Sequence, residues 1–353
     1  MKIVVLAGGF NTERNVGLTS GSGICRALRQ KGHQAIFVDM FMGLENYDGA
    51  LEDIFDAPDG LCPENHVGSM APDLEAVRAS RKDKSASVIG KDVLTVCAMA
   101  DIVFIAMHGK NGEDGRIQAA LDLLGVPYTG SGYLGAAMAM DKAVTKYFMD
   151  AEGIRTAPWR DVTYTEADIP RLVEELEVPC AVKIVNGGSS IGVELPDTKE
   201  ELESTLHRML KLGNHVVVEK KIKGREINIG VLGDTYLPAV EIIPKSAYFD
   251  YESKYQAGGA TEICPARITD SEWKQIGEMA VKLHKALRLG VYSRSDFILD
   301  AEGKAWCLEV NTLPGMTPTS LVPQEAACIG LSYADLCEKI VMDSLEERKA
   351  ERK

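Results

Sequence analysis

The chain has 353 residues, 45% of them hydrophobic, and a formal net charge of −13 at pH 7. This length allows sizeable cores and two or three domains. The acidic balance argues against nucleic acid or an anionic membrane surface as the main partner, and no apolar run approaches the length of a membrane span. Eight cysteines are scattered singly, and the start MKIVVLAGG reads as a strand, not a signal peptide. We therefore expect a cytoplasmic protein with reduced, mostly buried thiols.

The first third of the sequence predicts an α/β domain with a parallel sheet. An apolar strand at 3–7 leads into a polar loop at 10–16. A helix capped at Thr19 runs to about Lys31, and a second strand covers 35–38. This order of strand, loop, helix and strand is typical of a parallel sheet.

Residues 43–91 are expected to form an elaborated connection, in which the charged run at 81–85 is solvated. The next buried strand, at 102–107, delivers the loop at 108–115 to its carboxyl end, where open α/β sheets bind ligands. No cysteine and histidine set with zinc spacing accompanies His108. We therefore expect His108 to organise hydrogen bonds.

Several common nucleotide and catalytic motifs are excluded. The spacing Gly21-x-Gly23-x-x-x-Ala27 superficially resembles a dinucleotide fingerprint, but it lies inside the predicted helix instead of following a strand. The sequence contains no Walker loop, no kinase catalytic loop and no G-x-S-x-G elbow. If the protein binds a nucleotide, it does so with a fold other than those that carry these motifs.

The middle of the chain outlines a phosphate site. One helix is expected over 135–151, carrying Lys142, and a second over 166–177. Lys183 lies in an apolar strand at 180–185 that runs into a Gly/Ser loop. Considered singly, Lys142 and Lys183 are each better interpreted as ordinary surface lysines. A lysine at the end of a buried strand, beside backbone N–H groups, nevertheless has the outline of a phosphate site.

The following segments predict an antiparallel meander and a lid. The meander strands are expected at 216–221, 226–232 and 237–243, and the irregular segment at 244–265 has the length of a functional lid or a disordered loop. A capping box at Thr269-x-x-Glu272 opens a helix with a periodic apolar face. That face comprises Trp273, Ile276, Ala280, Leu283 and Leu287. A last helix at 333–344 is expected to end in a frayed charged tail.

Residues 291–320 predict a hairpin with a functional face. If Leu299 lies opposite Lys304, Arg294 faces Glu309 and Asp296 faces Cys307. One face then carries Arg294, Asp296, Glu309 and Asn311. The packing face carries Phe297, Trp306, Leu308 and Val310.

Two carboxylates and an amide oxygen on neighbouring strands suit a hard cation such as Mg²⁺. The alternative is a solvated ladder of charged pairs. Asn311 leads directly into TLPGMT, a stiff turn with backbone N–H groups, and a solvated ladder gives no reason for that arrangement. We favour the metal site.

These stretches resemble the D-alanine–D-alanine ligases of the ATP-grasp superfamily over nearly the whole chain. The matching motifs, in family order, are AGGFNTERNVGLTSG, HGKNGEDGRIQAALDLLGVPYTGSG, MDK, AVKIVNGGSSIGV, VEKKIKGREINIGVLG, YFDYESKYQAGG, ICPA, YSRSDFILD and LEVNTLPGMTPTSL. The resemblance implies ATP-dependent ligation of two D-alanines through an acyl phosphate, for peptidoglycan precursors, with Mg²⁺ or Mn²⁺. We also expect a homodimer.

The implied architecture has three domains. An N-terminal α/β substrate domain would cover 1–130. The central and C-terminal ATP-grasp lobes, which are α/β and α+β respectively, would cover 131–223 and 224–353. The lid at 244–265 would belong to the last lobe.

The resemblance also assigns site residues. Glu13 would anchor the first D-alanine's ammonium in a hydrogen-bonded set with Ser189 and Tyr255, and Ser320 would bind the second substrate's carboxylate. Arg294 and the Gly315 N–H would stabilise the oxyanion. Metal ligands would be Asp296, Glu309 and Asn311. The ATP site would comprise Lys142, Lys183, Ser190, Glu219, Lys220, Ile222, Glu226 and Lys254.

The sequence departs from the family pattern after Glu13-Arg14, where an acidic residue and Val-Ser are usual and Asn15-Val16-Gly17 stand here. This puts the fine geometry of the first subsite in doubt. Two alternatives remain: a ligase that takes D-lactate or D-serine second, and an ATP-binding protein without catalysis. Tyr255 favours D-alanine, and the complete Arg294, Asp296, Glu309 and Asn311 set disfavours a non-catalytic binder.

Overall fold

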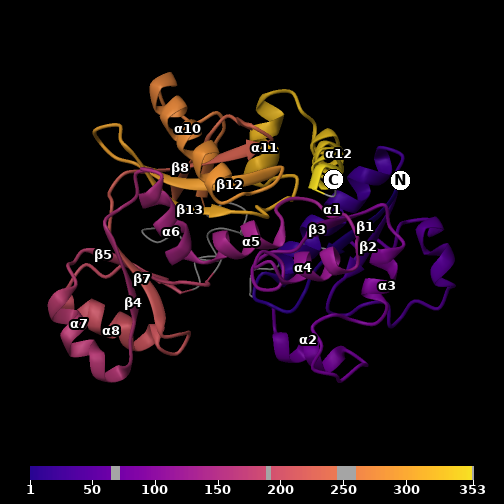
Figure 1. Ribbon diagram of the computed structural model, residues 1–353, viewed down its shortest axis with the longest axis horizontal. Helices are drawn as coiled ribbons and strands as arrows, with labels where there is room; N and C mark the ends of the chain where they lie inside the picture. The colour runs from indigo at the N-terminus through magenta and orange to yellow at the C-terminus, as the bar shows by residue number, and fades with distance from the viewer. Residues whose placement is uncertain (65–71, 188–191, 245–259, 352–353) are drawn as a thin grey trace.

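The computed structural model is a mixed α/β molecule with three sheets (Figure 1). The described residues are 1–64, 72–187, 192–244 and 260–351. The N-terminal sheet is parallel, in the order β2-β1-β3, and consists of β1 (Lys2–Ala7), β2 (Gln34–Asp39) and β3 (Ile102–Ala106). These strands confirm the predicted α/β opening. Outside these strands, Tyr128 forms an isolated bridge with Val103 of β3.

Helices and short turns surround this sheet: α1 (Arg14–Gln30), η1 (Leu51–Asp56), α2 (Leu74–Ser80), α3 (Val93–Ala98) and α4 (Arg116–Leu123). The predicted start of the first helix at Thr19 is wrong, because α1 begins at Arg14. Asn11 fixes the start of this helix with one local and one long-range hydrogen bond. Asn11 Oδ1 accepts from the Glu13 N–H at 2.8 Å, and Asn11 Nδ2 donates to the His108 carbonyl at 2.9 Å.

The charged run at 81–85 is not uniformly solvated. Arg81 is 1% exposed. Its guanidinium lies 4.7 Å from the Phe41 ring centroid and donates to the carbonyls of Ser87 and Ile89. Arg81 therefore pins the connection between β2 and β3 to the domain, and only the residues around it are solvated.

The central sheet is antiparallel, in the order β4-β7-β5-β6. Its strands are β4 (Trp159–Thr163), β5 (Cys180–Ile184), β6 (Val193–Glu194) and β7 (His215–Lys220), covered by η2 (Glu166–Asp168), α7 (Ile169–Glu175) and α8 (Lys199–Met209). Neither β4 nor α8 was predicted from the sequence. It was also wrong to place 216–221 in one meander with the next two strands, because β7 belongs to this sheet.

Two helices, α5 (Tyr133–Met140) and α6 (Lys142–Ala151), replace the single helix predicted at 135–151. Asp141 breaks them with an extended backbone (ψ 107°), and its side chain accepts from the Val144 N–H to cap α6. This cap places Lys142 at the first position of α6, where it can face the central sheet.

The C-terminal sheet is antiparallel, in the order β11-β10-β8-β12-β13, with β9 paired to β8. Its elements are β8 (Arg225–Leu232), β9 (Thr235–Tyr236), β10 (Val240–Pro244), β11 (Ala260–Ile263), α10 (Asp270–Ala286), β12 (Tyr292–Leu299), β13 (Ala305–Asn311), α11 (Leu321–Cys328) and α12 (Tyr333–Glu351). The predicted irregular segment at 244–265 is wrong at its ends, because Pro244 pairs with Ala260. Its interior, 245–259, lies outside the described residues.

The capping box that opens α10 is confirmed. Four of the five predicted core residues of α10 are buried, but Trp273 is 36% exposed. Its ring packs edge-on against Tyr236, and its N–H donates to the Leu237 carbonyl at 3.1 Å. The final helix does not fray after 344 as expected, since α12 continues to Glu351.

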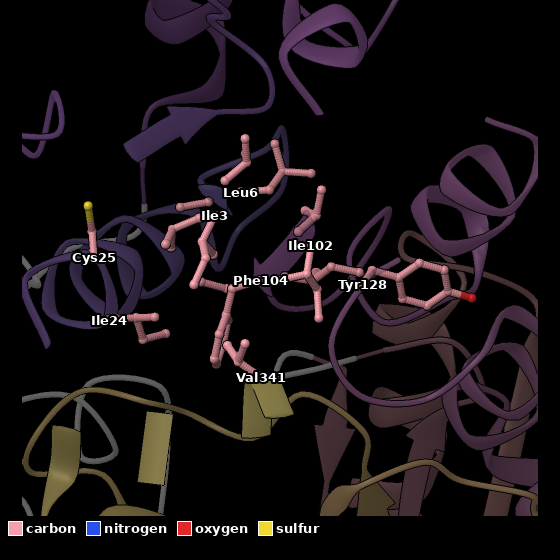
Figure 2. Close-up of a cluster of buried hydrophobic side chains, with 14 of the residues drawn as sticks. Ile3, Leu6, Ile24, Cys25, Ile102, Phe104, Tyr128 and Val341 are labelled. Atoms are coloured by element: carbon pink, nitrogen blue, oxygen red, sulfur yellow. The ribbon is translucent and has the colours of Figure 1, made fainter. Parts of the chain in front are cut away.

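The N-terminal core includes the C-terminal helix. Figure 2 shows Val341 of α12 beside Phe104 of β3, within a cluster that also contains Leu336 and Ile340. Arg348 extends this contact, since its guanidinium lies 4.1 Å from the Tyr128 ring centroid and donates to the Gly130 carbonyl at 2.7 Å. The first sheet is therefore closed by residues more than 200 positions away in the sequence. Among the described helices, none is both long and apolar enough to cross a membrane.

Candidate active site

An open cleft lies where the three sheets approach one another. Its lining includes Glu13 at the start of α1, Glu113 after β3, Lys142 of α6, and Glu309 and Asn311 of β13. Residues far apart in the sequence thus meet on one surface, and three of them are acidic.

The β12–β13 hairpin supplies the charged face of this cleft. The predicted register is wrong: Asp296 pairs with Glu309 and Arg294 with Asn311, whereas Phe297 pairs with Cys307. The shift between these pairs leaves Leu308 as an extra residue, a β-bulge. Arg294, Asp296, Glu309 and Asn311 nevertheless lie on one face, as expected, because both cross-strand pairs fall on the same side of the bulge.

The bulge also reverses part of the predicted packing face. Phe297 and Val310 are buried, and Cys307 and Ala305 join them. Trp306 pairs with Ile298 and is half-buried, with its N–H donating to Asp300 at 2.8 Å. Trp306 and Leu308 are therefore not the core residues that simple alternation predicts.

The carboxylates of this hairpin are each paired with a cation. The Arg294 guanidinium donates to both Asp296 oxygens at 2.8 and 3.0 Å, and Lys142 Nζ lies 3.5 Å from Glu309. Asn311 Nδ2 is 3.4 Å from Asp296. In the described parts of the chain, no group of three acidic, histidine or cysteine residues could hold a metal. Two adjacent carboxylates and an amide fit Mg²⁺, which takes its remaining ligands from phosphate and water.

A buried charge network lies behind the cleft. Lys183 Nζ is 2.5 Å from Glu219, and Lys146 Nζ contacts the other oxygen of Glu219. Burial would raise the pKa of Glu219, but the charges of Lys183 and Lys146 outweigh it and hold that pKa below its usual value. The network therefore contains an ionised carboxylate between two lysines.

Lys146 was not selected as a site residue from the sequence. It follows Lys142 by four residues, which places both on one face of α6. Lys146 also contacts the Thr156 hydroxyl, which donates to the Cys307 carbonyl at 2.8 Å. Lys146 thus connects β7 of the central sheet with β13 of the β12–β13 hairpin.

The other predicted ATP residues are distributed around the junction of the central and C-terminal sheets. Lys142 Nζ donates to the Gly187 carbonyl at 2.5 Å, at the start of the Gly/Ser loop. Lys220, at the end of β7, is exposed, whereas Ile222 and Glu226 are half-buried. Ser189, Ser190, Lys254 and Tyr255 lie outside the described residues.

The opposite end of the cleft contains two neighbouring carboxyls. Glu13 and Glu113 both line it, and Glu113 accepts from the N–H groups of Gly109 at 2.7 Å and Leu313 at 3.1 Å. Burial raises the pKa of Glu113 to about 8, and the charge of Glu13 adds to the rise. Glu113 was not selected from the sequence, and its place in the loop at the carboxyl end of β3 was the available signal.

His108 acts as the expected organiser of hydrogen bonds. Its Nδ1 lies 2.8 Å from the Leu313 carbonyl, and its Nε2 lies 3.5 Å from the Ser20 hydroxyl. Burial lowers the pKa of His108, so the ring is neutral at pH 7. Since Leu313 contacts both His108 and Glu113, this pair fixes the turn that follows β13.

That turn holds the last two predicted residues. The Ser320 hydroxyl accepts from the Thr317 N–H at 3.0 Å, and a Cβ built on Gly315 would lie 3.0 Å from the same hydroxyl. A side chain at position 315 would therefore crowd the Ser320 hydroxyl. The structure brings Gly315 and Ser320 together, although neither lines the cleft described above.

A parallel-sheet domain followed by two antiparallel lobes, with lysines and paired carboxylates between them, defines an ATP-grasp ligase. Family models agree: "D-ala D-ala ligase N-terminus" matches residues 2–131 and "D-ala D-ala ligase C-terminus" matches 148–342. The chain belongs to the D-alanine–D-alanine ligase family.

Individual relatives match over nearly their whole length. The D-alanine–D-alanine ligase of Pediococcus pentosaceus is 40% identical over 344 residues, 97% of each chain. That of Lacticaseibacillus casei is 40% identical over 347 residues, 98% of this chain and 96% of the relative. The crystal structure of the Bacillus anthracis ligase complexed with ATP is 26% identical, with a TM-score of 0.72 and 99% coverage of both chains.

Proposed function

We propose that this protein joins two D-alanines into D-alanyl-D-alanine, with conversion of ATP to ADP and phosphate, for peptidoglycan precursor synthesis in the cytoplasm. The observation that carries the proposal is the Arg294, Asp296, Glu309 and Asn311 face beside Lys142, in a chain that matches curated ligases over 97% of its length. The ATP complex of a structural relative supports the choice of nucleotide.

The reaction begins when the carboxylate of the first D-alanine attacks the γ-phosphorus of ATP. Phosphoryl transfer depends on positioning and charge neutralisation, which Lys142 and Lys183 supply from α6 and β5. Asp296, Glu309 and Asn311 would hold Mg²⁺ or Mn²⁺, which neutralises phosphate charge when bound. The product of this step is an acyl phosphate.

The second step is attack by the amine of the second D-alanine on the acyl carbonyl. Arg294 and the Gly315 N–H would stabilise the oxyanion, a contribution of roughly 2.7–4 kcal/mol per donor in comparable sites. Glu13 would receive the ammonium of the first substrate, in a chain with Ser189 and Tyr255. Ser320, held by the Thr317 turn, would bind the carboxylate of the second substrate.

Remaining roles follow from the same assignment. Glu219, Lys220, Ile222 and Glu226 would contact the adenosine, Ser190 and Lys254 would contact the phosphates, and 245–259 would belong to the lid. Acyl phosphates hydrolyse readily, so a cover that excludes water is a physical need. We also propose a homodimer and the domain division at 130 and 223.

Phosphate release from ATP and Mg²⁺ tests the function, measured with D-alanine, with L-alanine and with no amino acid. We expect release only with D-alanine, and mass spectrometry of the product should show the dipeptide. Equal release under all three conditions would contradict the ligase activity. Faster coupling of D-alanine to added D-lactate or D-serine than to itself would instead correct the second substrate.

A further inference from the structure

Two cysteine sulfurs are in contact at the surface of the C-terminal lobe. Cys264 directly follows β11, and Cys328 is the last residue of α11. Their Sγ atoms are 3.0 Å apart. A disulfide bond measures about 2.05 Å, so the sulfurs need to approach by about 1 Å to form one.

A second contact holds the same two elements together without the sulfurs. Gln324, one turn before Cys328 on α11, donates its side-chain N–H group to Glu262 of β11 at 2.5 Å and to the Thr319 carbonyl at 2.7 Å. The strand is thus fixed to the helix two residues before Cys264. The cysteine contact is therefore part of a built junction between β11 and α11.

The two thiols differ in access. Cys328 is exposed and Cys264 is half-buried. Burial raises the pKa of the Cys264 thiol, and a thiol is reactive as its thiolate. Cys328 is therefore the thiol that an oxidant in solution meets first, and Cys264 is placed to react with the product.

The other cysteines do not offer the same arrangement. Five are buried, namely Cys25, Cys97, Cys180, Cys307 and Cys337. Cys62 is half-buried with a pKa lowered to about 7, chiefly by a hydrogen bond from Cys25. Its neighbour Cys25 is fully buried, so this second pair has no exposed member and provides an internal comparison.

We propose that Cys264 and Cys328 are a thiol modification site that forms a reversible intramolecular disulfide with oxidants of the peroxide class. The Cys328 thiolate attacks a peroxide oxygen, which breaks the O–O bond and gives a sulfenic acid and one hydroxide. The Cys264 thiol then attacks the sulfenic sulfur and expels a second hydroxide. Protonation by the thiol protons makes two waters, so two thiols lose two electrons and two protons. Cellular dithiols reverse the step by exchange.

The disulfide would close a loop of 64 residues that contains α10, β12 and β13. A cross-link of this kind restricts the unfolded chain and stabilises the folded one. Because the sulfurs already touch, the bond is formed without separating β11 from α11. The oxidised protein is therefore expected to be more heat-resistant than the reduced protein.

Peptide mapping tests the bond directly. Fully reduced full-length protein is treated with hydrogen peroxide, alkylated and digested without reductant. We expect one peptide that joins 264 to 328, two mass units lighter than the sum of its parts and lost after dithiothreitol. Cys62→Ser should keep this peptide, and Cys328→Ser should lose it. Separate alkylation of Cys264 and Cys328 at every peroxide dose, or links only between two molecules, would overturn the proposal.

Thermal unfolding tests the consequence. Oxidation should raise the melting temperature of the wild type and of Cys62→Ser by at least about 2 °C, and dithiothreitol should abolish the rise. Cys264→Ala and Cys328→Ser should show no rise in melting temperature. Because the two substitutions lie on different elements, a local packing defect in one variant would not explain the same result in both. An equal rise in Cys328→Ser would show that another thiol is responsible, and no rise in the wild type would refute the stabilising role.

Discussion

Glu113 is a half-buried carboxyl whose charge changes in the physiological range. Its pKa is raised to about 8 by burial and by Glu13, against about 4.5 for an exposed glutamate. Between these values the folded protein binds a proton that the unfolded chain releases. The stability that this proton provides is complete below about pH 4.5 and is lost as pH rises through about 8.

Glu113→Gln should therefore flatten the dependence of stability on pH. Each pKa unit corresponds to about 1.4 kcal/mol, so the wild type should lose a few kcal/mol relative to the variant between pH 5 and pH 8. Urea unfolding at a series of pH values measures this difference. Parallel stability curves for the two proteins would show that Glu113 does not titrate in this range.

Glu309 of β13 lies directly across from Asp296 of β12, as expected if both residues bind the same metal ion. Glu309→Gln should lower turnover by orders of magnitude with the fold intact, and added Mg²⁺ or Mn²⁺ should restore part of it. Glu302→Gln, in the exposed turn of the same hairpin, is the control and should behave as wild type. If Glu309 is only part of a surface ladder, its change costs at most about 1 kcal/mol of stability and turnover is unaffected.

At the scale of elements, the glycines of α1 have a packing role. A Cβ on Gly21 would lie 2.5 Å from the Ala7 Cβ and 3.0 Å from the Phe37 ring. A Cβ on Gly23 would lie 2.9 Å from the Tyr333 hydroxyl of α12. The dinucleotide-like spacing therefore reflects close approach of α1 to β1, β2 and α12, which agrees with its rejection as a cofactor motif.

Gly21→Ala should destabilise the protein although alanine favours helices by about 1 kcal/mol. The clash with β1 should outweigh that gain and cost about 1–3 kcal/mol in all. Gly213→Ala is the control, because its Cβ would meet only Ile184, at 3.7 Å. Chemical denaturation of both variants measures the effect. A stabilised Gly21→Ala would mean that α1 can move away from the sheet.

Local pattern predicted most of the longer strands and several helices, and it failed where contacts with distant residues determine the structure. Alternation placed Arg294, Asp296, Glu309 and Asn311 on one face, but it could not show the bulge at Leu308. That bulge occurs where the Cys307 N–H donates to the Arg155 carbonyl and the Thr156 hydroxyl contacts Cys307, partners from another lobe. The side-chain cap of Asp141 likewise divided a segment whose composition is helical throughout.

At the scale of the whole molecule, Lys146 links two lobes through buried charge. Lys146 and Glu219 are each 2% exposed in their side chains. Removing one member of a buried pair costs about 3–5 kcal/mol, because it leaves an uncompensated charge. When Lys146 is removed, Lys183 still pairs with Glu219 and so preserves part of the stabilising charge interaction.

Lys146→Met should therefore cost about 3 kcal/mol of stability and raise the Michaelis constant for ATP more than that for D-alanine. Lys146→Arg should restore part of both. The exposed pair of Lys274 and Glu278 is the control, and Lys274→Met should change stability by less than about 0.5 kcal/mol. Equal effects of Lys146→Met on both Michaelis constants would contradict a role confined to the nucleotide side.

The place of α12 could not be predicted from periodicity alone, because an amphipathic helix does not specify which core it joins. Val341→Asp should unfold the N-terminal core, since it buries an unpaired charge in the cluster of Figure 2. Met342→Asp, at the neighbouring exposed position, should be tolerated. Circular dichroism and soluble yield distinguish the two, and a well-folded Val341→Asp would contradict the packing described here.

Closure of the first sheet by α12 has a consequence for biosynthesis. After β3 leaves the ribosome, about 230 further residues must be added before α12 begins, which takes roughly 10–45 s at about 5–20 residues per second. During that interval the apolar surface around Phe104 has no covering helix. The nascent N-terminal domain therefore waits incomplete through most of translation, and chaperones that shield exposed apolar surface would act on it before the enzyme is released.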